Sequence, residues 1–170
     1  MKVTNKYVFF WKEHPFCNFT KCTINYEGKT FTSSEQMFMW MKADFFGDDE
    51  TAAKILRTNE PEVARKLGRL VKNYDDAEWD KNRVAAMFQA VWSKFLQNED
   101  LRKKLCDSKY NGLQFVEAAY YDRIWGIGYN EDDALANESD WGRNELGKIL
   151  DKVRAMLMMK SAGIYRDIKE

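Results

Sequence analysis

The longest stretch of regular hydrophobic spacing in the chain covers residues 76–97. Its large apolar residues recur every three or four positions, which places them on one side of a helix. These residues are Val84, Met87, Phe88, Val91, Trp92 and Phe95. A helix of this kind must bury its apolar side against other elements. The pattern therefore predicts a long core helix and favours a predominantly helical fold.

Shorter helices are expected on both sides of this segment. Ser33 and Gln36 have the spacing of a capping box, which predicts a helix from Ser33 to about residue 45. Residues 51–56 form a short candidate, and Pro61 stands near the start of another. The inner residues expected for that helix are Val63, Leu67, Leu70 and Val71. Asn98 is a candidate cap for a helix with Leu101 and Leu105 inward.

The last helix is expected over residues 144–159. Its expected inward residues are Leu146, Ile149, Leu150, Val153 and Leu157. Strand signals are few: residues 7–11, a hairpin of 22–26 and 29–31 around an EG turn, and 113–116. Residues 131–139 are acidic and loop-like. Together these patterns predict a predominantly α chain with a few short β-strands (α+β), folded as one domain over residues 1–170.

Composition excludes several classes of protein. Lys+Arg and Asp+Glu both number 27 in 170 residues, so the net charge is zero, which argues against broad binding of nucleic acid or anionic membrane. No apolar run approaches the roughly 20 residues of a membrane helix, and the N-terminus lacks a signal-peptide pattern. Three cysteines without paired metal spacing disfavour a disulfide scaffold and a zinc site. We expect a cytoplasmic protein with no metal and no membrane partner.

The segment VEAAYYDRIWGIG, residues 116–128, has an unusual composition for a strand end. It places Asp122 and Trp125 beside Gly126, together with a second carboxylate at Glu117. An acid, an aromatic ring and glycines that let the backbone approach a ligand are typical of a binding site. The alternative is a buried Trp beside a turn Asp that caps backbone amides.

A second polar pair lies on the helix expected to begin near Ser33. Glu35 and Lys42 are seven residues apart, or two turns, so they share one face with Met39 between them. Carboxylate and ammonium groups on a largely apolar helix indicate a polar notch. The alternative is a Glu that favours the helix dipole and a solvated Lys.

Two further stretches could bind phosphate. Residues 142–147, GRNELG, place a glycine before a helix start, which would offer free backbone amides to an anion. Arg69, after Gly68, offers a guanidinium, although a solvated Arg is the simpler interpretation. No Ser-His-Asp set or HExxH is present, and the one histidine, His14, is expected at the surface. Catalysis would therefore depend on carboxylates, which suits hydrolysis of a glycosidic bond.

Taken in order, these segments resemble the YbiA-like family, also called NADAR. The matching segments are PFCNF (15–19), GKTFTSSEQMF (28–38) followed by Lys42, LGR (67–69), Trp79, KFLQ (94–97), LQFVE (113–117), DRIWGIG (122–128) and WGRNELG (141–147). The resemblance extends from about residue 7 to residue 158. It is carried by the order and spacing of the segments rather than by any one of them.

The resemblance implies a compact, mainly helical YbiA-like fold and N-glycosidase activity without a cofactor. It implies two substrate classes: a phosphoribosylamino-pyrimidine of riboflavin synthesis, and ADP-ribose attached to guanine in nucleic acid. Glu35, Asp122 and Lys42 become the catalytic candidates, with the acid and base roles of the carboxylates left open. The substrate-binding candidates are Trp125 for stacking on the base, Arg69 with Lys42 for phosphate, and Asn18, Gly126, Asn144 and Glu117.

Two positions depart from the family pattern. Gln36 stands where the family often has His, so no proton shuttle is expected there, and Cys17 replaces a Ser, which weakens any ligand contact from that side chain. One alternative from another class is a module that binds ADP-ribose or a nucleotide without turnover. A nucleic-acid-binding protein is disfavoured by the zero net charge. The aromatic surplus suits a pocket or an interface equally, so no oligomeric state is predicted.

Overall fold

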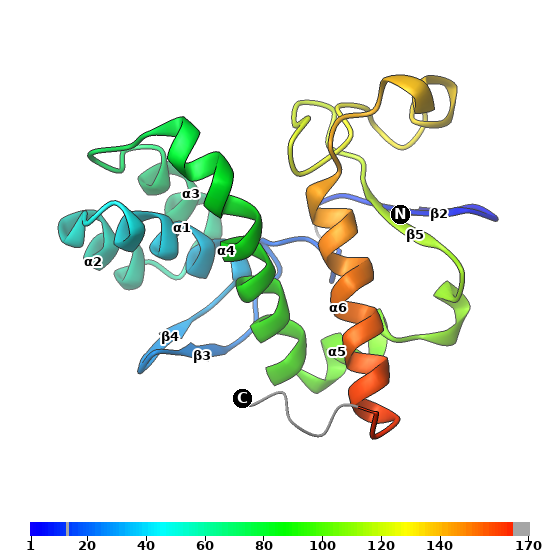
Figure 1. The fold of residues 1–170 in the computed structure, drawn as a ribbon, viewed down its shortest axis with the longest axis horizontal. Helices are drawn as coiled ribbons and strands as arrows, with labels where there is room; N and C mark the ends of the chain where they lie inside the picture. The colour runs from blue at the N-terminus through cyan, green and yellow to red at the C-terminus, as the bar shows by residue number, and fades with distance from the viewer. Residues whose placement is uncertain (13, 165–170) are drawn as a thin grey trace. The chain divides into compact units, whose positions relative to one another are not determined.

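The computed structural model describes residues 1–12 and 14–164 of the chain (Figure 1). These residues form two compact units. The terminal unit combines Met1–Cys17 with Glu99–Glu170, and the inner unit is Asn18–Asn98. The chain is mainly helical with short strands, as the sequence predicted. Organisation as one domain over residues 1–170 stays a prediction.

The terminal unit contains a three-stranded sheet in the order β1-β2-β5. β1 (Lys2–Val3) is antiparallel to β2 (Tyr7–Phe10), and β2 is parallel to β5 (Gln114–Glu117). All four residues of β2 are buried, as expected for a central strand covered on both faces. The strands predicted at 7–11 and 113–116 are therefore confirmed, whereas the two-residue β1 was not predicted.

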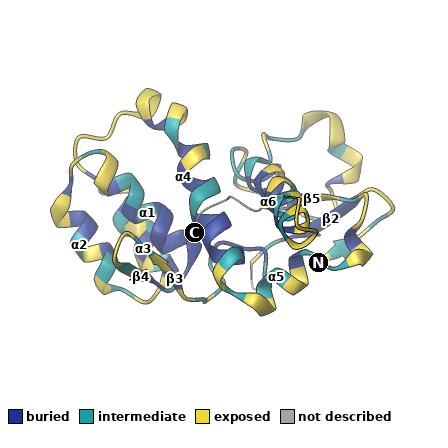
Figure 2. Cartoon of the chain, turned by 60° about the horizontal axis from the view of Figure 1, so that its bottom comes forward, coloured by how far each residue is buried: buried dark blue, intermediate teal, exposed yellow. Residues whose placement is uncertain are grey.

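Helix α6 (Glu145–Ser161) packs against β5. Its five expected inward residues are all buried, and Lys148, Lys152 and Ala155 between them are exposed. The helix thus has a buried and an exposed side (Figure 2). The unit also contains α5 (Glu99–Leu105) and two 3₁₀ turns, η1 (Ser108–Tyr110) and η2 (Leu135–Asp140). Leu105 is buried as predicted, and Leu101 is partly buried. The acidic stretch 131–139 is not wholly irregular, because η2 occupies its second half.

The inner unit begins with a hairpin and continues with four helices. β3 (Ile24–Tyr26) pairs antiparallel with β4 (Lys29–Phe31), and the turn residues Glu27 and Gly28 both have positive φ, as a tight hairpin requires. The helices are α1 (Ser34–Phe45), α2 (Asp49–Arg57), α3 (Pro61–Gly68) and α4 (Asp76–Gln97). The hairpin and all four helices were predicted.

Helix α1 contacts α2, α3 and α4 and is buried over most of its length, whereas α2 and α3 have exposed outer sides (Figure 2). On α4, Met87, Val91, Trp92 and Phe95 are buried, and Val84 and Phe88 are partly buried. Asn98 ends α4. Its side-chain nitrogen donates to the carbonyls of Lys94 and Thr23, and its side-chain oxygen accepts from the Thr23 amide.

The inner face predicted for α3 is wrong in part. Val71 is buried and Leu67 is partly buried, as predicted, whereas Val63 and Leu70 are exposed. The buried residues of α3 itself are Pro61, Ala64 and Gly68. At Gly68 a Cβ atom would overlap the Met39 side chain on α1. The small residues of α3 therefore form its contact face, because they let the two helices approach closely, and Val63 is turned outward.

No helix in the described residues is both long and apolar enough to cross a bilayer. Cys17, Cys22 and Cys106 all lie in the described part of the chain and form no disulfide.

A prediction for stability concerns Asp151 on α6, whose Oδ1 accepts a hydrogen bond from the Phe115 amide of β5 at 3.1 Å. Burial raises the pKa of this carboxyl from 3.8 to about 6. The contribution to stability is therefore complete below about pH 4 and is lost as the pH rises through 6. Asp151→Asn stays neutral and still accepts the hydrogen bond.

We expect Asp151→Asn to be more stable than the wild type at pH 7 by about 1 kcal/mol, after allowance for the partial exposure of the group. At pH 4 the difference should vanish. Urea unfolding at the two pH values measures both. An equal difference in unfolding free energy at pH 4 and pH 7 would contradict the raised pKa of Asp151.

Candidate active site

The first turn of α1 places Glu35 in a nearly dry position, with 6% of its surface exposed. Ser33 caps the helix by accepting a hydrogen bond from the Gln36 amide, as the capping-box spacing predicted. Asn18 holds the same turn: its carbonyl accepts from the Glu35 amide at 3.1 Å, and its Oδ1 accepts from the Ser34 hydroxyl at 3.0 Å. The Asn18 side chain, a predicted substrate contact, is therefore engaged in holding Glu35 in place.

Gln36, which replaces the family's frequent His, has a structural position. Its Oε1 accepts from the Thr32 amide at 2.7 Å, and its Nε2 donates to the carbonyls of Ile55 and Thr58 at 2.9 and 2.6 Å. The side chain thus joins the end of the hairpin to the end of α2 beside Glu35. A group with both oxygen and nitrogen saturated in this way is unsuited to moving protons.

Lys42 lies two turns along the same face of α1 and is half-buried. Its Nζ donates to the Gly68 carbonyl at 2.9 Å and lies 4.0 Å from the centre of the Tyr74 ring. Burial lowers the pKa of Lys42, and the nearby positive charge of Arg83 lowers it further, while Asp76 opposes the shift. The alternative of a fully solvated lysine is therefore excluded.

Arg69 directly follows Gly68 at the end of α3 and is exposed. Within the described residues its guanidinium has no hydrogen bond or ion pair, so it can receive an anion. The contact between Lys42 and Gly68 brings Lys42 to the same end of α3. The two cations predicted to bind phosphate are thus held at adjacent backbone positions: Lys42 bonds to Gly68, and Arg69 is the next residue.

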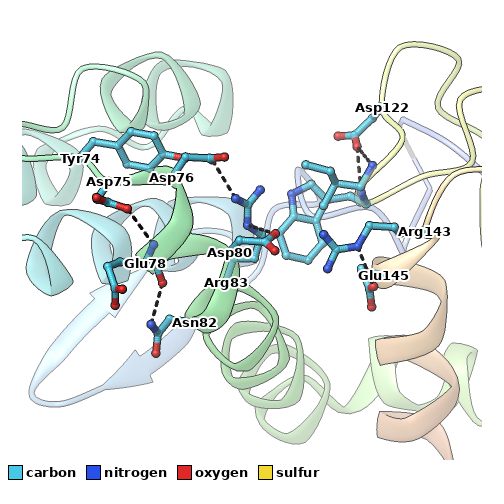
Figure 3. Close-up of polar contacts among 12 residues, drawn as sticks. Tyr74, Asp75, Asp76, Glu78, Asp80, Asn82, Arg83, Asp122, Arg143 and Glu145 are labelled. Atoms are coloured by element: carbon cyan, nitrogen blue, oxygen red, sulfur yellow. Dashed lines mark hydrogen bonds and ion pairs between the residues drawn. The ribbon is translucent and has the colours of Figure 1, made fainter.

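A polar network around Arg83 was not predicted (Figure 3), and its Tyr74 ring lies against Lys42. The Tyr74 hydroxyl donates to Asp76 Oδ1 at 2.6 Å, and the Arg83 guanidinium donates to the same oxygen at 2.9 Å. Arg83 Nε also lies 3.2 Å from Asp80. The spacing of the three residues on α4, which places Asp76, Asp80 and Arg83 on one helix face, is a sequence signal that could have found this network.

In the terminal unit, Asp122 closes a tight turn (Figure 3). Its Oδ1 accepts from the amides of both Ile124 and Trp125 at 2.8 Å, which is the capping role named above as the alternative to catalysis. The side chain is partly exposed, and so is that of Trp125. A Cβ atom at Gly126 would lie 2.7 Å from the Glu117 carbonyl, so close backbone packing requires a glycine here, and its substrate contact stays a prediction.

The turn is fixed by pairing with the segment before α6. Backbone amides of residues 142–146 each donate to a carbonyl of residues 123–127, at distances from 2.7 to 3.2 Å. The amides of Asn144, Glu145 and Leu146 at the start of α6 are among these donors. The prediction that residues 142–147 offer free amides to a phosphate is therefore wrong, because carbonyls of the turn already occupy them.

Asn144 joins the same helix start to the sheet. Its backbone is left-handed (φ 49°), its Oδ1 accepts from the Glu117 amide at 3.0 Å, and its Nδ2 donates to the Phe115 carbonyl at 3.0 Å. The side chain thus pairs with β5 as another strand would. Glu117, at the end of β5, is partly buried beside it. Substrate contacts by Asn144 and Glu117 stay predictions, and their contacts within the protein indicate support of the turn.

The candidate residues therefore fall into two sets. The inner unit holds Asn18, Glu35, Lys42 and Arg69, and the terminal unit holds Glu117, Asp122, Trp125, Gly126 and Asn144. Each set has one carboxylate residue that contacts hold in place. The backbone amide of Glu35 donates to the Asn18 carbonyl, and the Asp122 side chain accepts from two turn amides. Their roles in catalysis stay predictions.

Comparison with known proteins identifies the family. The NADAR domain profile matches residues 9–158. Protein irg-1 of Caenorhabditis elegans is 37% identical over 91% of this chain and 74% of its own length. N-glycosidase R617 of Acanthamoeba polyphaga mimivirus is 35% identical over 89% of this chain and 96% of its own length.

The fold has a solved counterpart. The NMR structure of the Escherichia coli protein YbiA is similar with a TM-score of 0.76 and 25% sequence identity. The similarity covers 99% of this chain and 94% of that one. The chain belongs to the NADAR domain family, as the order of its sequence segments indicated.

Proposed function

We propose that this protein hydrolyses the C–N bond between a ribose and a base-like leaving group, either on ADP-ribosylated guanine in nucleic acid or on a phosphoribosylamino-pyrimidine. The chain is a hydrolase of N-glycosyl bonds. The observation that carries this is its match over 96% of the length of a relative named as an N-glycosidase. Membrane binding has no place in the proposal, and a cytoplasmic location stays a prediction.

The chemistry needs two things from the protein. As the C–N bond breaks, positive charge develops at C1′ of the ribose, and a carboxylate stabilises it. The departing base leaves more readily when it receives a proton. Glu35 and Asp122 are the two carboxylates proposed for charge stabilisation and for activating water. Their surroundings differ, since Glu35 is nearly dry and Asp122 is partly exposed.

The remaining candidates would bind the substrate. Trp125 is partly exposed and would stack on the leaving base. Arg69, exposed and unpaired in the described part of the chain, would bind phosphate. Lys42 was proposed both as a phosphate contact and as a catalytic group, and its half-buried position beside Tyr74 is consistent with either role.

One assay tests the proposal. Guanine-ADP-ribosylated DNA and the phosphoribosylamino-pyrimidine are offered separately, and the released sugar is identified by mass. We expect release of ADP-ribose from the first or of ribose phosphate from the second. Release from neither, together with tight binding of ADP-ribose by calorimetry, would instead support a module that binds ADP-ribose without turnover.

A further inference from the structure

The ammonium group of Lys42 has an unusual environment within the inner unit. It donates to a neutral carbonyl, Gly68 O, and lies over the face of an aromatic ring, Tyr74. No carboxylate forms an ion pair with it among the described residues. A half-buried lysine would normally gain such a partner, because burial of an unpaired charge is costly.

The carboxylate of the network that acts on the charge of this lysine is engaged elsewhere. Asp76 Oδ1 accepts from both the Tyr74 hydroxyl and the Arg83 guanidinium. Arg83 is held from a second side by Asp80, and its side chain is only 8% exposed. The two aspartates are largely exposed, so they lie on the solvent side of a buried cation. These contacts fix the Tyr74 ring against Lys42.

The same groups act on the protonation of Lys42. Burial and the positive charge of Arg83 lower its pKa, and Asp76 raises it. The ring of Tyr74 contributes no full charge, because burial and its hydrogen bond to Asp76 raise the pKa of its hydroxyl. Arg83 is close enough to affect the ammonium, and its guanidinium donates a hydrogen bond to the Asp76 carboxylate.

We propose that Tyr74, Asp76 and Arg83 are positioning residues that hold Lys42 in place as the proton donor to the leaving base. The inference rests on the proposed N-glycosidase activity and adds a specific role for Lys42. The proton passes from Nζ to the base nitrogen as the C1′–N bond breaks, and that nitrogen keeps the bonding electron pair. Water then adds its hydroxyl to C1′, and its remaining proton restores the ammonium.

The role of Lys42 is tested with Lys42→Arg. Arginine keeps the positive charge and can still bind phosphate, but it does not release a proton at working pH. We expect kcat to fall about 100-fold or more while KM changes little. A kcat within about threefold of the wild type would overturn the proton-donor role.

The positioning role is tested without substrate, by NMR titration of the lysine side chains. The signal of Lys42 is identified by its absence from Lys42→Arg. Arg83→Met should move its titration to higher pH, and Asp76→Asn to lower pH, because the two charges act in opposite directions. Tyr74→Phe keeps the ring and removes only the hydroxyl, so it should move the titration of Lys42 less than the two charge variants do. Lys81→Met removes an exposed cation of α4, the helix that carries Arg83, and should leave the titration of Lys42 unchanged.

Activity gives a second readout of the same variants. The alkaline limb of the kcat profile should move with the titration of Lys42 in Arg83→Met and Asp76→Asn, an effect that a merely structural role would not produce. Unmoved titration in both variants, with the fold retained by circular dichroism, would overturn the positioning role. If the wild type turns over neither substrate, the proposed function fails, and the titration alone decides whether these residues position Lys42.

Discussion

Asp122→Asn is expected to lose at least about 100-fold in turnover with little change in thermal stability. The Oδ1 atom of Asp122 accepts from the amides of Ile124 and Trp125, and the amide oxygen of asparagine can accept both hydrogen bonds. The substitution therefore keeps the cap and removes only the negative charge. A rate measurement on the accepted substrate, paired with thermal unfolding, separates the two roles of this side chain.

Two further variants complete the test. Asp122→Ala removes the cap as well as the charge, so we expect the same loss of turnover plus about 1 kcal/mol of unfolding free energy. Asp133→Asn changes another carboxylate of the same unit, one that accepts from Asn130, and should keep full activity. Full turnover in Asp122→Asn would show that the residue serves only as a cap.

Elements with strong local signals were predicted correctly. The start of α1 follows from Ser33 and Gln36, which form a cap within one turn of helix. The hairpin turn follows from Glu27 and Gly28, and α6 from its regular apolar spacing. In each case the determining contacts are between residues close in sequence, so a single sequence carries the information.

Features that depend on distant partners were missed. The pairing of residues 142–146 with 123–127 occupies the amides that were predicted to be free for phosphate. A helix start can be recognised in the sequence, but whether its amides are free depends on another segment. The contact face of α3 was misplaced in part for a similar reason, because Gly68 packs against Met39 of α1 and a large apolar residue cannot.

The candidate residues show the same division. Glu35 and Lys42 were placed on one helix face by spacing alone, and the structure bears this out. The contacts around Lys42 come from Gly68 and Tyr74, which lie 26 and 32 residues further along the chain, so spacing could not supply them. Asn144 and Gly126 matched family segments, yet their contacts are with β5 and its surroundings.

The largest stability effect is expected at Gly147, in the first turn of α6. In a helix exposed to solvent, Gly→Ala stabilises by up to about 1 kcal/mol. At Gly147 a Cβ atom would overlap the Phe115 carbonyl oxygen and both amide atoms of Asn144. It would therefore push α6 away from β5 and break the two hydrogen bonds between Asn144 and that strand. We expect Gly147→Ala to lose about 3 kcal/mol or more of unfolding free energy.

Thermal unfolding measures this loss as a fall of roughly 10 °C in Tm for a chain of this size. Lys148→Ala is the matched control: it lies one residue further along α6, is exposed, and forms only a 3.7 Å ion pair with Glu145. It should stay within about 0.5 kcal/mol of the wild type. A Tm for Gly147→Ala equal to that of the control would mean that α6 and β5 can separate without cost. In that case Asn144 would not hold the turn that carries Asp122.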